Sequence, residues 1–465
     1  MSVQTVGTTL SAAIVGAGPS GFYAAEHLLR AGFAVDLLEA LPTPFGLVRA
    51  GVAPDHPKIK SVSRIFEKTA QHPAFRYFGG VEVGVHLARE DLLERYDAVV
   101  YAVGTPGGNR LGIPGEDLAG VWAATDFVGW YNGHPAHADH AFDLSARGAV
   151  VIGNGNVAID VARMLVLDPA ELRRTDTADH AIAALSGAGV RDVTLLGRRG
   201  PAQAAFTNPE LLELGELARA DVVVDPGQLA LDAHTAALPA AGTTDKTTRR
   251  NVEILREYAG REPAGRSHRV DLRFLRSPLE VLGDEHGRVT GLRVAVNRME
   301  QAPGGGLRAV PTGAEETIAC GLVLRSIGYR GQPVAGVPFD DGRGLIRNRD
   351  GRIVDEEGAV APREYVAGWI KRGPSGVIGT NKRCAADTVA RIVEDRDAGR
   401  LGSASRADRA GADAWLRERA PALVTWEGWG AIDGYETGLG RPHGRPRVKL
   451  VRVGEMHAIA GAVAS

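Results

Sequence analysis

Two glycine-rich turns are the parts of this sequence whose spacing most directly suggests a chemistry. The first reads Gly-Ala-Gly-Pro-Ser-Gly over residues 16–21, between an apolar run at 12–15 and an amphipathic segment at 19–31. In a G-x-G-x-x-G turn the glycines permit the tight bend, the approach of a pyrophosphate and close helix–strand packing. The following helix directs its positive end at the phosphates. The pattern predicts a dinucleotide site at Gly16, Ala17, Gly18, Pro19 and Gly21.

An acidic residue completes this first fingerprint. Glu39 ends the next apolar run, 34–38, where a carboxylate can accept hydrogen bonds from ribose hydroxyls. Strand, turn, helix, second strand and acid thus follow one another in the order that a dinucleotide-binding unit requires. This register favours a nucleotide site over a simple packing turn.

A second fingerprint carries arginines in place of the acid. Gly-Asn-Gly-Asn-Val-Ala over 153–158 has the form G-x-G-x-x-A and lies between an expected strand, 149–152, and an expected helix, 156–167. The next strand, 193–196, leads into Gly-Arg-Arg. An acid here would repel a 2′-phosphate, whereas a planar guanidinium binds one through two hydrogen bonds. The sequence therefore predicts an NADP(H) site made of Gly153, Asn154, Gly155, Asn156, Arg198 and Arg199.

The pattern of strand, glycine-rich turn and helix thus occurs twice along the chain. This repetition predicts the fold class: α/β, with two Rossmann-like dinucleotide-binding domains. An acid-marked site followed by an arginine-marked site indicates a flavin and a pyridine nucleotide in one chain. Hydride would then pass from the nicotinamide C4 to the flavin N5, with the protein supplying orientation and electrostatics.

Composition excludes several other classes of protein. The chain has 465 residues and a formal net charge of −2, so no global basic field predicts binding to nucleic acid. Its 2 cysteines, Cys320 and Cys384, lie far apart, which excludes a disulfide scaffold, an iron–sulfur cluster held by this chain and the vicinal dithiol of a disulfide reductase. No metal site is predicted. The lack of a targeting segment and of an apolar run of ~18 residues predicts a cytoplasmic protein with no membrane span.

A longer set of segments resembles a known family. Residues 42–56, Pro-Thr-Pro-Phe-Gly-Leu-Val-Arg-Ala-Gly-Val-Ala-Pro-Asp-His, resemble the adrenodoxin-reductase type of ferredoxin–NADP(+) reductase. The likeness continues in both fingerprints and covers nearly the whole chain. Its further segments are Gly-Arg-Arg-Gly-Pro at 197–201, Gln-Ala-Ala-Phe-Thr at 203–207, Arg-Ser-Ile-Gly-Tyr at 325–329, Gly-Trp-Ile-Lys-Arg-Gly-Pro-Ser-Gly-Val-Ile-Gly-Thr-Asn-Lys at 368–382 and His-Gly-Arg-Pro-Arg-Val-Lys at 443–449.

This resemblance implies an FAD-binding domain formed by residues 1–105 and 331–465, and an NADP-binding domain at 106–330. Beside the first fingerprint and Glu39, the FAD-binding residues it implies are Leu47, Val83, Trp369, Gly376, Val377 and Ile378. It adds Glu210 and the Gly376 backbone to the NADP site. His56 and Glu213 would pair beside the flavin as the catalytic residues and tune the nicotinamide pocket. Arg110 lies one place closer to Ile113 than the family pattern has it, so no nucleotide contact is assigned to it.

The electron acceptor that the family implies is an acidic ferredoxin, which takes electrons singly. Residues 246–276 hold Lys246 and eight arginines against four acidic residues, and they form the candidate docking surface. Arg249 and Arg250 are the expected contacts, since the family has basic residues on this helix. The predicted activity is that of an NADPH-dependent ferredoxin reductase. A flavin-dependent monooxygenase and a non-catalytic, NADP(H)-sensing flavoprotein remain as alternatives.

Overall fold

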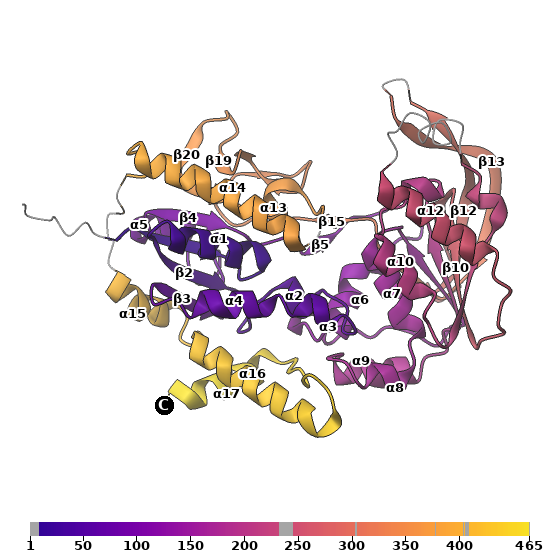
Figure 1. Ribbon diagram of the computed structural model, residues 1–465, viewed down its shortest axis with the longest axis horizontal. Coiled ribbons are helices and arrows are strands. Elements are labelled where there is room, and N and C mark those ends of the chain that lie inside the picture. Colours follow the sequence, from indigo (N-terminus) through magenta and orange to yellow (C-terminus); the bar gives the residue numbers. More distant parts are fainter. Residues whose placement is uncertain are drawn as a thin grey trace, which may run out of the picture. The chain divides into compact units, whose positions relative to one another are not determined.

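The computed structural model describes residues 9–231, 245–302, 305–376, 378–402, 404 and 409–464 (Figure 1). The chain divides into two compact units. Unit 1 consists of Met1–Gly107 and Tyr329–Ser465, and unit 2 of Gly108–Gly328. The two points at which the chain passes from one unit to the other, after Gly107 and after Gly328, lie within two residues of the domain boundaries expected from the sequence. Each unit is described by itself below.

Unit 1 is built on a sheet in the order β18-β19-β20-β4-β1-β2-β3. The strands from β20 to β3 run parallel, and β18 and β19 are added antiparallel at one edge. The strands are β1 Ser11–Val15, β2 Ala34–Glu39, β3 Phe75–Gly79, β4 Ala98–Tyr101, β18 Asn348–Arg349, β19 Arg352–Val354 and β20 Val360–Val366. All of β1 is buried, as expected of a central parallel strand covered on both faces.

Alternate residues of these strands supply two different cores. Ala12 and Ile14 point into a core shared with α1 (Pro19–Arg30) and α14 (Ile378–Asp397), which pack on each other. Ala13 and Val15 point into the opposite core, against α5 and α15. The remaining helices of unit 1 and the two further helices just named are α2 Leu47–Ala50, α3 Pro57–Lys60, α4 Ser63–Ala70, α5 Arg89–Arg95, α13 Trp369–Arg372, α15 Arg409–Arg419, α16 Trp426–Gly440, η4 Arg441–His443 and α17 Val453–Ala464.

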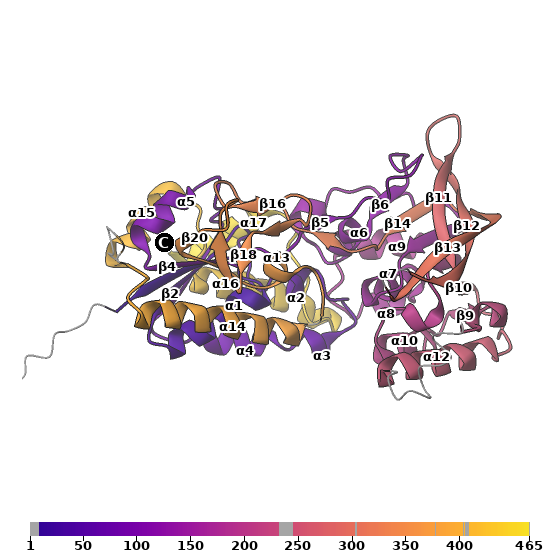
Figure 2. The ribbon, with the colours of Figure 1, turned by 90° about the horizontal axis from the view of Figure 1, so that it is seen from above.

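Unit 2 repeats the arrangement with a wholly parallel sheet in the order β6-β14-β7-β8-β10-β9. Its strands are β6 Val121–Ala123, β7 Gly148–Ile152, β8 Asp192–Leu196, β9 Ala220–Val224, β10 His268–Arg273 and β14 Leu322–Arg325. A separate antiparallel sheet is formed by β11 Arg276–Gly283, β12 Val289–Gln301 and β13 Leu307–Ala319, which Figure 2 shows as long twisted strands.

The helices of unit 2 include those that follow its fingerprint and those that carry further candidate residues. They are α6 Ala124–Tyr131, η1 Pro135–His137, α7 Asn156–Val166, α8 Pro169–Leu172, α9 Asp179–Ser186, η2 Pro201–Gln203, α10 Asn208–Leu214, η3 Pro226–Leu229 and α12 Lys246–Ala259.

In the described part of the chain, four short strands lie outside these three sheets: β5 Gly107–Gly108, β15 Tyr329–Arg330, β16 Phe339–Asp340 and β17 Leu345–Ile346.

The strand that the sequence placed before each glycine-rich turn, β1 in unit 1 and β7 in unit 2, lies inside a sheet between parallel neighbours and leads through that turn into a helix, α1 or α7. The prediction of an α/β fold with two Rossmann-like domains is therefore confirmed. Among the residues that the structure describes, no helix combines the length and the apolar character needed to cross a membrane.

Candidate functional site

The first glycine-rich turn joins β1 to α1, and its three glycines meet three different surroundings. Gly16 has φ +106°, and a Cβ there would lie 2.6 Å from the carbonyl oxygen of Ala102. A Cβ on Gly21 would lie 2.0 Å from the Gly16 oxygen, so this glycine is required for helix–strand packing. Around a Cβ on Gly18 no atom lies within 4 Å. The turn thus leaves open space beside its second glycine, where a pyrophosphate would lie.

The start of α1 suits an anion. Pro19 occupies its first turn, and Gly18 at the N-cap offers no side chain to the free N–H groups of that turn. No acidic residue lies in the first turn. These N–H groups are therefore not committed to a capping carboxylate, and the positive end of the helix dipole is not neutralised by its own sequence.

Glu39 ends β2 and binds the same turn. Its Oε2 accepts a hydrogen bond of 2.7 Å from the backbone N–H of Ala17, and its Oε1 accepts one of 3.2 Å from Leu41. Burial raises the pKa of Glu39, and the backbone N–H groups of Ala17, Leu41 and Ala40 act in the opposite direction. Since each carboxylate oxygen has two lone pairs, the side chain can still accept from a ribose hydroxyl.

The other residues assigned to FAD from the sequence all belong to unit 1. Leu47 begins α2 with 40% of its surface exposed, Val83 is half-buried in a bridge to Leu87, and Gly376 has φ +78° just before Ile378 begins α14. Val377 lies outside the described residues.

Trp369, the first residue of α13, has an unsatisfied donor. Its Nε1 is buried and has no hydrogen-bond partner among the residues that the structure describes. Buried indole N–H groups are normally paired, so this donor fits a site that a bound group completes.

The second glycine-rich turn joins β7 to α7 and is built like the first. Gly153 has φ +143°, and a Cβ there would lie 2.1 Å from the carbonyl oxygen of Ser326. Around Gly155 there is open space. Asn154 packs so closely on Gly197 that a Cβ at 197 would lie 1.6 Å from Asn154 Nδ2. The turn and the end of β8 are thus fitted to each other.

Asn154 and Asn156 also hold the segment after η2. The Asn154 carbonyl accepts a hydrogen bond of 2.7 Å from the N–H of Ala205, and Asn156 Oδ1 accepts one of 2.8 Å from the N–H of Thr207. These bonds fix the segment that leads into α10, on whose first turn Glu210 stands. One oxygen of Glu210, Oε2, is buried and has no hydrogen-bond partner in the described part of the chain.

Arg198 and Arg199 follow β8 with exposed side chains on a fixed backbone. The Arg198 carbonyl accepts a hydrogen bond of 2.9 Å from Asn297 Nδ2, and the Arg199 carbonyl accepts one of 3.1 Å from the N–H of Leu275. Asn297 was missed by the sequence analysis, because it lies 99 residues away on β12 and carries no motif. The loop is thereby held in place while its two guanidinium groups stay exposed.

His56 and Glu213, the predicted catalytic pair, belong to different units. His56 is buried at the N-cap of α3 in unit 1. Glu213 lies on α10 in unit 2, where its Oε2 is 3.2 Å from Nη1 of the buried Arg163. The pairing of His56 with Glu213 stays a prediction.

Arg110 is engaged by acidic neighbours. Its Nη2 lies 2.6 Å from Asp117, and its Nε lies 3.7 Å from Glu116. Glu116 in turn accepts hydrogen bonds from Leu111 and Gly112 and pairs with Arg325 at 2.6 Å. These contacts give Arg110 a local structural role and assign it no nucleotide contact.

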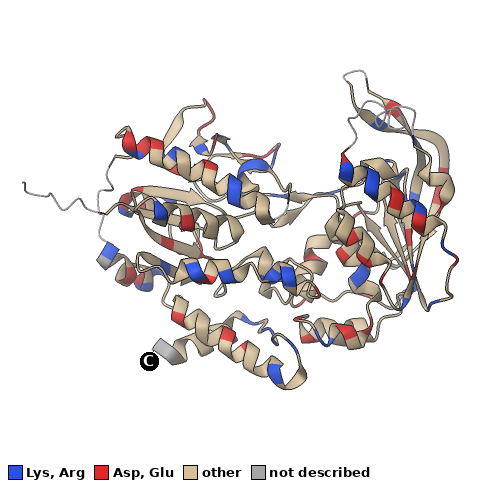
Figure 3. Ribbon diagram, in the orientation of Figure 1, with Lys and Arg blue, Asp and Glu red and all other residues tan. Residues whose placement is uncertain are grey.

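The basic stretch 246–276 does not form one exposed surface. Arg276 is buried and pairs with Glu316 at 2.7 Å, Arg273 pairs with Asp271 at 2.9 Å, and Arg266 binds the Leu217 carbonyl. Arg261 and Arg269 are exposed but lie outside α12, and on α12 itself basic side chains are interspersed with acidic ones (Figure 3).

On α12 the two predicted docking arginines differ. Arg249 is exposed, whereas Arg250 Nη1 lies 3.2 Å from Glu253 and 3.0 Å from Glu257. Two carboxylates therefore compete for the charge of Arg250, and Arg249 is the better placed of the two for an acidic partner.

A chain in which each of two sheets contains a parallel strand that leads through a glycine-rich turn into a helix belongs to the class of proteins with two Rossmann-like domains. Residues 14–80 match the family model described as an NAD(P)-binding Rossmann-like domain. The NADPH-ferredoxin reductase FprA of Mycobacterium leprae is 50% identical over 458 residues, covering 96% of this chain and 97% of that protein. The mitochondrial NADPH:adrenodoxin oxidoreductase of Salvelinus fontinalis is 42% identical, with 99% and 93% covered. The chain belongs to this family of NADPH-ferredoxin and adrenodoxin reductases.

A solved structure agrees over the whole chain. Mycobacterium tuberculosis FprA in complex with NADPH superposes with a TM-score of 0.90 at 49% identity, covering 97% of this chain and 99% of that one. The likeness therefore extends through both units and is not confined to the Rossmann-like segment that the family model matches.

Proposed function

We propose that this protein is an FAD-dependent NADPH:ferredoxin reductase. The observation that carries the proposal is the pair of dinucleotide turns, each open beside its second glycine, one bound to Glu39 and the other followed by two exposed arginines. Membership of a family whose relatives are named NADPH-ferredoxin reductase and NADPH:adrenodoxin oxidoreductase supports the same activity.

Unit 1 is the proposed FAD domain. The open space at Gly18 would take the pyrophosphate, Glu39 would accept from the ribose, and the unpartnered Nε1 of Trp369 would donate to the bound group. Leu47, Val83, Gly376, Val377 and Ile378 are the further proposed contacts. When bound, FAD supplies the chemistry that accepts two electrons together from NADPH and releases them one at a time.

Unit 2 is the proposed NADP domain. Gly153, Gly155 and the start of α7 would hold the pyrophosphate, while Arg198 and Arg199 would pair with the 2′-phosphate. Charge-assisted hydrogen bonds to such a phosphate contribute about 1.5–3 kcal/mol each. That magnitude is enough to select NADPH over NADH by orders of magnitude.

His56 and Glu213 are proposed to tune the nicotinamide pocket. Neither is needed as an acid or base for the transfer of a hydride, which carries no separate proton. Glu213 is held by the buried Arg163, so its carboxylate has a fixed position and a compensated charge. These residues would set the electrostatic surroundings of the reacting groups.

The electrons leave to a separate protein. Both cysteines are free and buried, and burial raises the pKa of Cys320 to about 12, so that side chain does not have the character of a redox-active thiolate. We propose an acidic ferredoxin as the acceptor, steered in part by Arg249 on α12. Two buried, unpaired cysteines also suit a reducing compartment, and we place the protein in the cytoplasm.

The test is to mix the FAD-loaded protein with NADPH anaerobically, then to add a [2Fe–2S] ferredoxin and cytochrome c. The reductase is expected to lose its flavin absorbance at once and to reduce cytochrome c only when ferredoxin is present. Flavin that stays oxidised would point to a sensor. In a separate aerobic run, oxygen uptake that depends on an organic substrate, without ferredoxin reduction in the anaerobic run, would point to a monooxygenase.

A further inference from the structure

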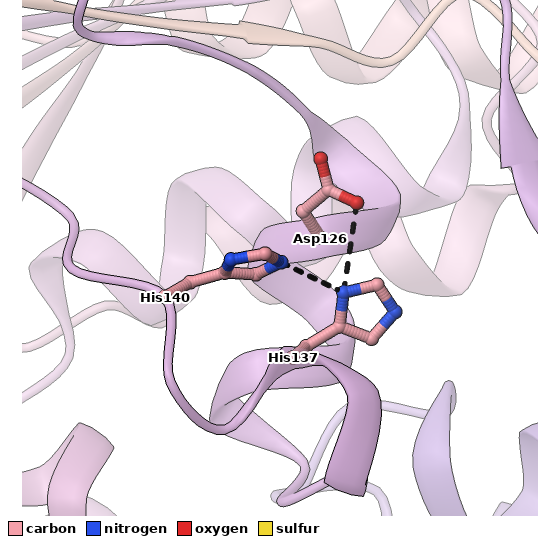
Figure 4. A group of neighbouring side chains, drawn as sticks. All are labelled: Asp126, His137 and His140. Atoms are coloured by element: carbon pink, nitrogen blue, oxygen red, sulfur yellow. Dashed lines mark hydrogen bonds and ion pairs between the residues drawn. The ribbon is translucent and has the colours of Figure 1, made fainter.

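Three metal-ligating side chains come together in unit 2, outside both dinucleotide turns. Asp126 stands in the first turn of α6, His137 ends the short helix η1 that follows, and His140 lies in the loop beyond (Figure 4). Their ligand atoms all lie within 4.8 Å of one another. The sequence by itself predicts no metal site here, because these residues do not have the spacing of a familiar metal motif.

The separations are those of ligands around a small cation. His137 Nδ1 lies 3.2 Å from His140 Nε2 and 3.6 Å from Asp126 Oδ1. Bonds of about 2.0–2.1 Å to a tetrahedral zinc ion place two ligand atoms about 3.3–3.4 Å apart. Both of these distances are close to this value, and the third pair, Asp126 and His140, lies within 4.8 Å, so a small movement brings all three to one ion.

Packing holds both imidazole rings in place. Gly129 of α6 faces the His137 ring, and a Cβ there would lie 2.3 Å from His137 Cδ2. The His140 ring packs against Trp122, with 5.1 Å between the ring centroids. The backbone turn is closed by hydrogen bonds from His137 N–H to the His134 carbonyl and from His140 N–H to the His137 carbonyl. The rings are thus positioned in advance, which favours binding.

A proton on His137 does not explain the arrangement as well as a cation does. Nδ1 of His137 faces a carboxylate oxygen and a second imidazole nitrogen together, as the dashed lines in Figure 4 show. A hydrogen bond between the two rings, whichever nitrogen donates, engages only two of the three groups, since Asp126 Oδ1 at 3.6 Å lies beyond hydrogen-bond distance of His137 Nδ1. A metal ion accepts all three lone pairs at once. The three residues are only partly buried, so an ion can reach them from solvent.

We propose that Asp126, His137 and His140 bind one divalent transition-metal ion. Two imidazoles and one carboxylate match the preferences of Zn²⁺ and its neighbours Co²⁺ and Ni²⁺ rather than those of Mg²⁺ or Ca²⁺, which take oxygen ligands. Water completes the coordination. The ion ties the loop after η1 to the start of α6, directly after β6, and its role is structural. The site stands independently of the reductase activity.

The experiment is a calorimetric titration of the untagged, FAD-loaded protein with Zn²⁺, after treatment with a chelator and desalting. The wild type is expected to bind one ion per chain. His137→Gln, His140→Gln and Asp126→Asn are each expected to weaken that binding by about tenfold or more, since a lost ligand costs at least as much as a lost supporting contact. Cobalt bound at the same site is expected to quench the fluorescence of Trp122 and to show the visible bands of tetrahedral Co²⁺.

His286→Gln is the matched control, because His286 is an exposed histidine beside an acid, Glu285, at 3.6 Å. Its binding curve is expected to equal that of the wild type. Thermal melting without metal, together with flavin reduction by NADPH, checks that each variant is folded. The proposal is overturned if the folded wild type shows no saturable binding, or if the folded double variant His137→Gln/His140→Gln binds Zn²⁺ as well as the wild type does.

Discussion

The carboxylate of Glu39 accepts a hydrogen bond from the backbone N–H of Ala17, with 2.7 Å between Oε2 and the nitrogen. The acid at the end of β2 is therefore bound to the glycine-rich turn itself, and from the same position it would accept hydrogen bonds from a ribose. One side chain couples the two ends of the proposed adenosine diphosphate site, so its loss affects the shape of the turn as well as a ligand contact.

Glu39→Ala is expected to weaken FAD binding by about 10- to 100-fold. The change removes the acceptor for the N–H groups of Ala17 and Leu41, and hydrogen bonds to charged groups contribute about 1.5–3 kcal/mol. Glu39→Gln keeps one oxygen and is expected to lose less. FAD titration of the apoprotein, followed by flavin fluorescence, measures both. Glu90→Ala, at an exposed glutamate of the same unit, is the control. An unchanged FAD affinity in Glu39→Ala would remove Glu39 from the site.

Arg198→Ala and Arg199→Ala are expected to lower kcat/KM for NADPH by about tenfold or more each and to leave kcat/KM for NADH nearly unchanged. The reason is that only the 2′-phosphate distinguishes the two cofactors. Steady-state reduction of ferricyanide measures both values. Arg174→Ala is the control, since this exposed arginine lies beyond the C-terminal end of α7, away from Gly153. Equal losses with both cofactors would contradict the assignment.

His56→Gln and Glu213→Gln are expected to retain NADPH oxidation, with kcat lowered by about tenfold at most, because a tuning residue shifts the electrostatic surroundings without carrying a required proton. Stopped-flow recording of flavin reduction by NADPH measures the effect. Arg163→Met is expected to lower stability as well, since it leaves Glu213 without the guanidinium 3.2 Å away. Complete loss of activity in a flavin-loaded His56→Gln variant would show that His56 is essential.

Arg249→Glu is expected to slow ferredoxin-dependent reduction of cytochrome c several-fold at low salt, while ferricyanide reduction stays unchanged. The charge reversal acts on steering of an acidic partner, so the difference should vanish as the ionic strength rises. Arg250→Glu is expected to have a smaller effect on docking, because Glu253 and Glu257 already pair with that guanidinium. Arg174→Glu serves as the charge control. A ferricyanide rate that falls in parallel would exclude a docking role.

Asp395 is expected to make the stability of unit 1 sensitive to acid. Burial alone would raise the pKa of this carboxyl, but hydrogen bonds from Arg352, Tyr365 and Arg400 lower it to about 2. Because the pKa is lower in the folded state than the value of about 3.9 in the unfolded chain, the ionised carboxylate stabilises the folded state at pH values above about 3.9. This contribution to the free energy of unfolding is lost as the pH falls toward 2. It amounts to about 1–2 kcal/mol, since Arg400 is largely exposed and screened by solvent.

Urea unfolding of wild type and Asp395→Asn at several pH values measures this contribution. The free energies of unfolding are expected to differ at pH 6 and to converge between about pH 4 and pH 2. Asp355→Asn is the control, an aspartate in the turn between β19 and β20 that accepts a hydrogen bond from the N–H of Ala359. A difference between wild type and Asp395→Asn that stays constant over this range would contradict the assigned pKa.

Much of the site was predictable because the information is local. The glycines of both turns, Glu39 and Arg198 with Arg199 lie at fixed spacings on strand–turn–helix units, and the structure places each at the end of its expected element. These spacings follow from the geometry of one βαβ unit, so no distant residue is needed to recognise them.

Contacts made by distant parts of the chain were not predictable. Asn297 holds the Arg198 carbonyl only because β12 returns to the end of β8, and Arg276 is buried only because β11 and β13 bring Glu316 to it. The cluster of Asp126, His137 and His140 depends likewise on the turn of η1. Long-range strand pairing and loop closure decide these contacts, and residue spacing alone does not encode them.

In the proposed reaction, electrons pass from NADPH through this protein to a ferredoxin. The most direct measurement is anaerobic titration of oxidised [2Fe–2S] ferredoxin with NADPH, in the presence of a catalytic amount of the FAD-loaded protein, followed by the ferredoxin absorbance. We expect rapid reduction of two single-electron ferredoxins per NADPH, as electron balance requires. A protein that reduces ferricyanide with NADPH but leaves every tested ferredoxin oxidised would contradict it.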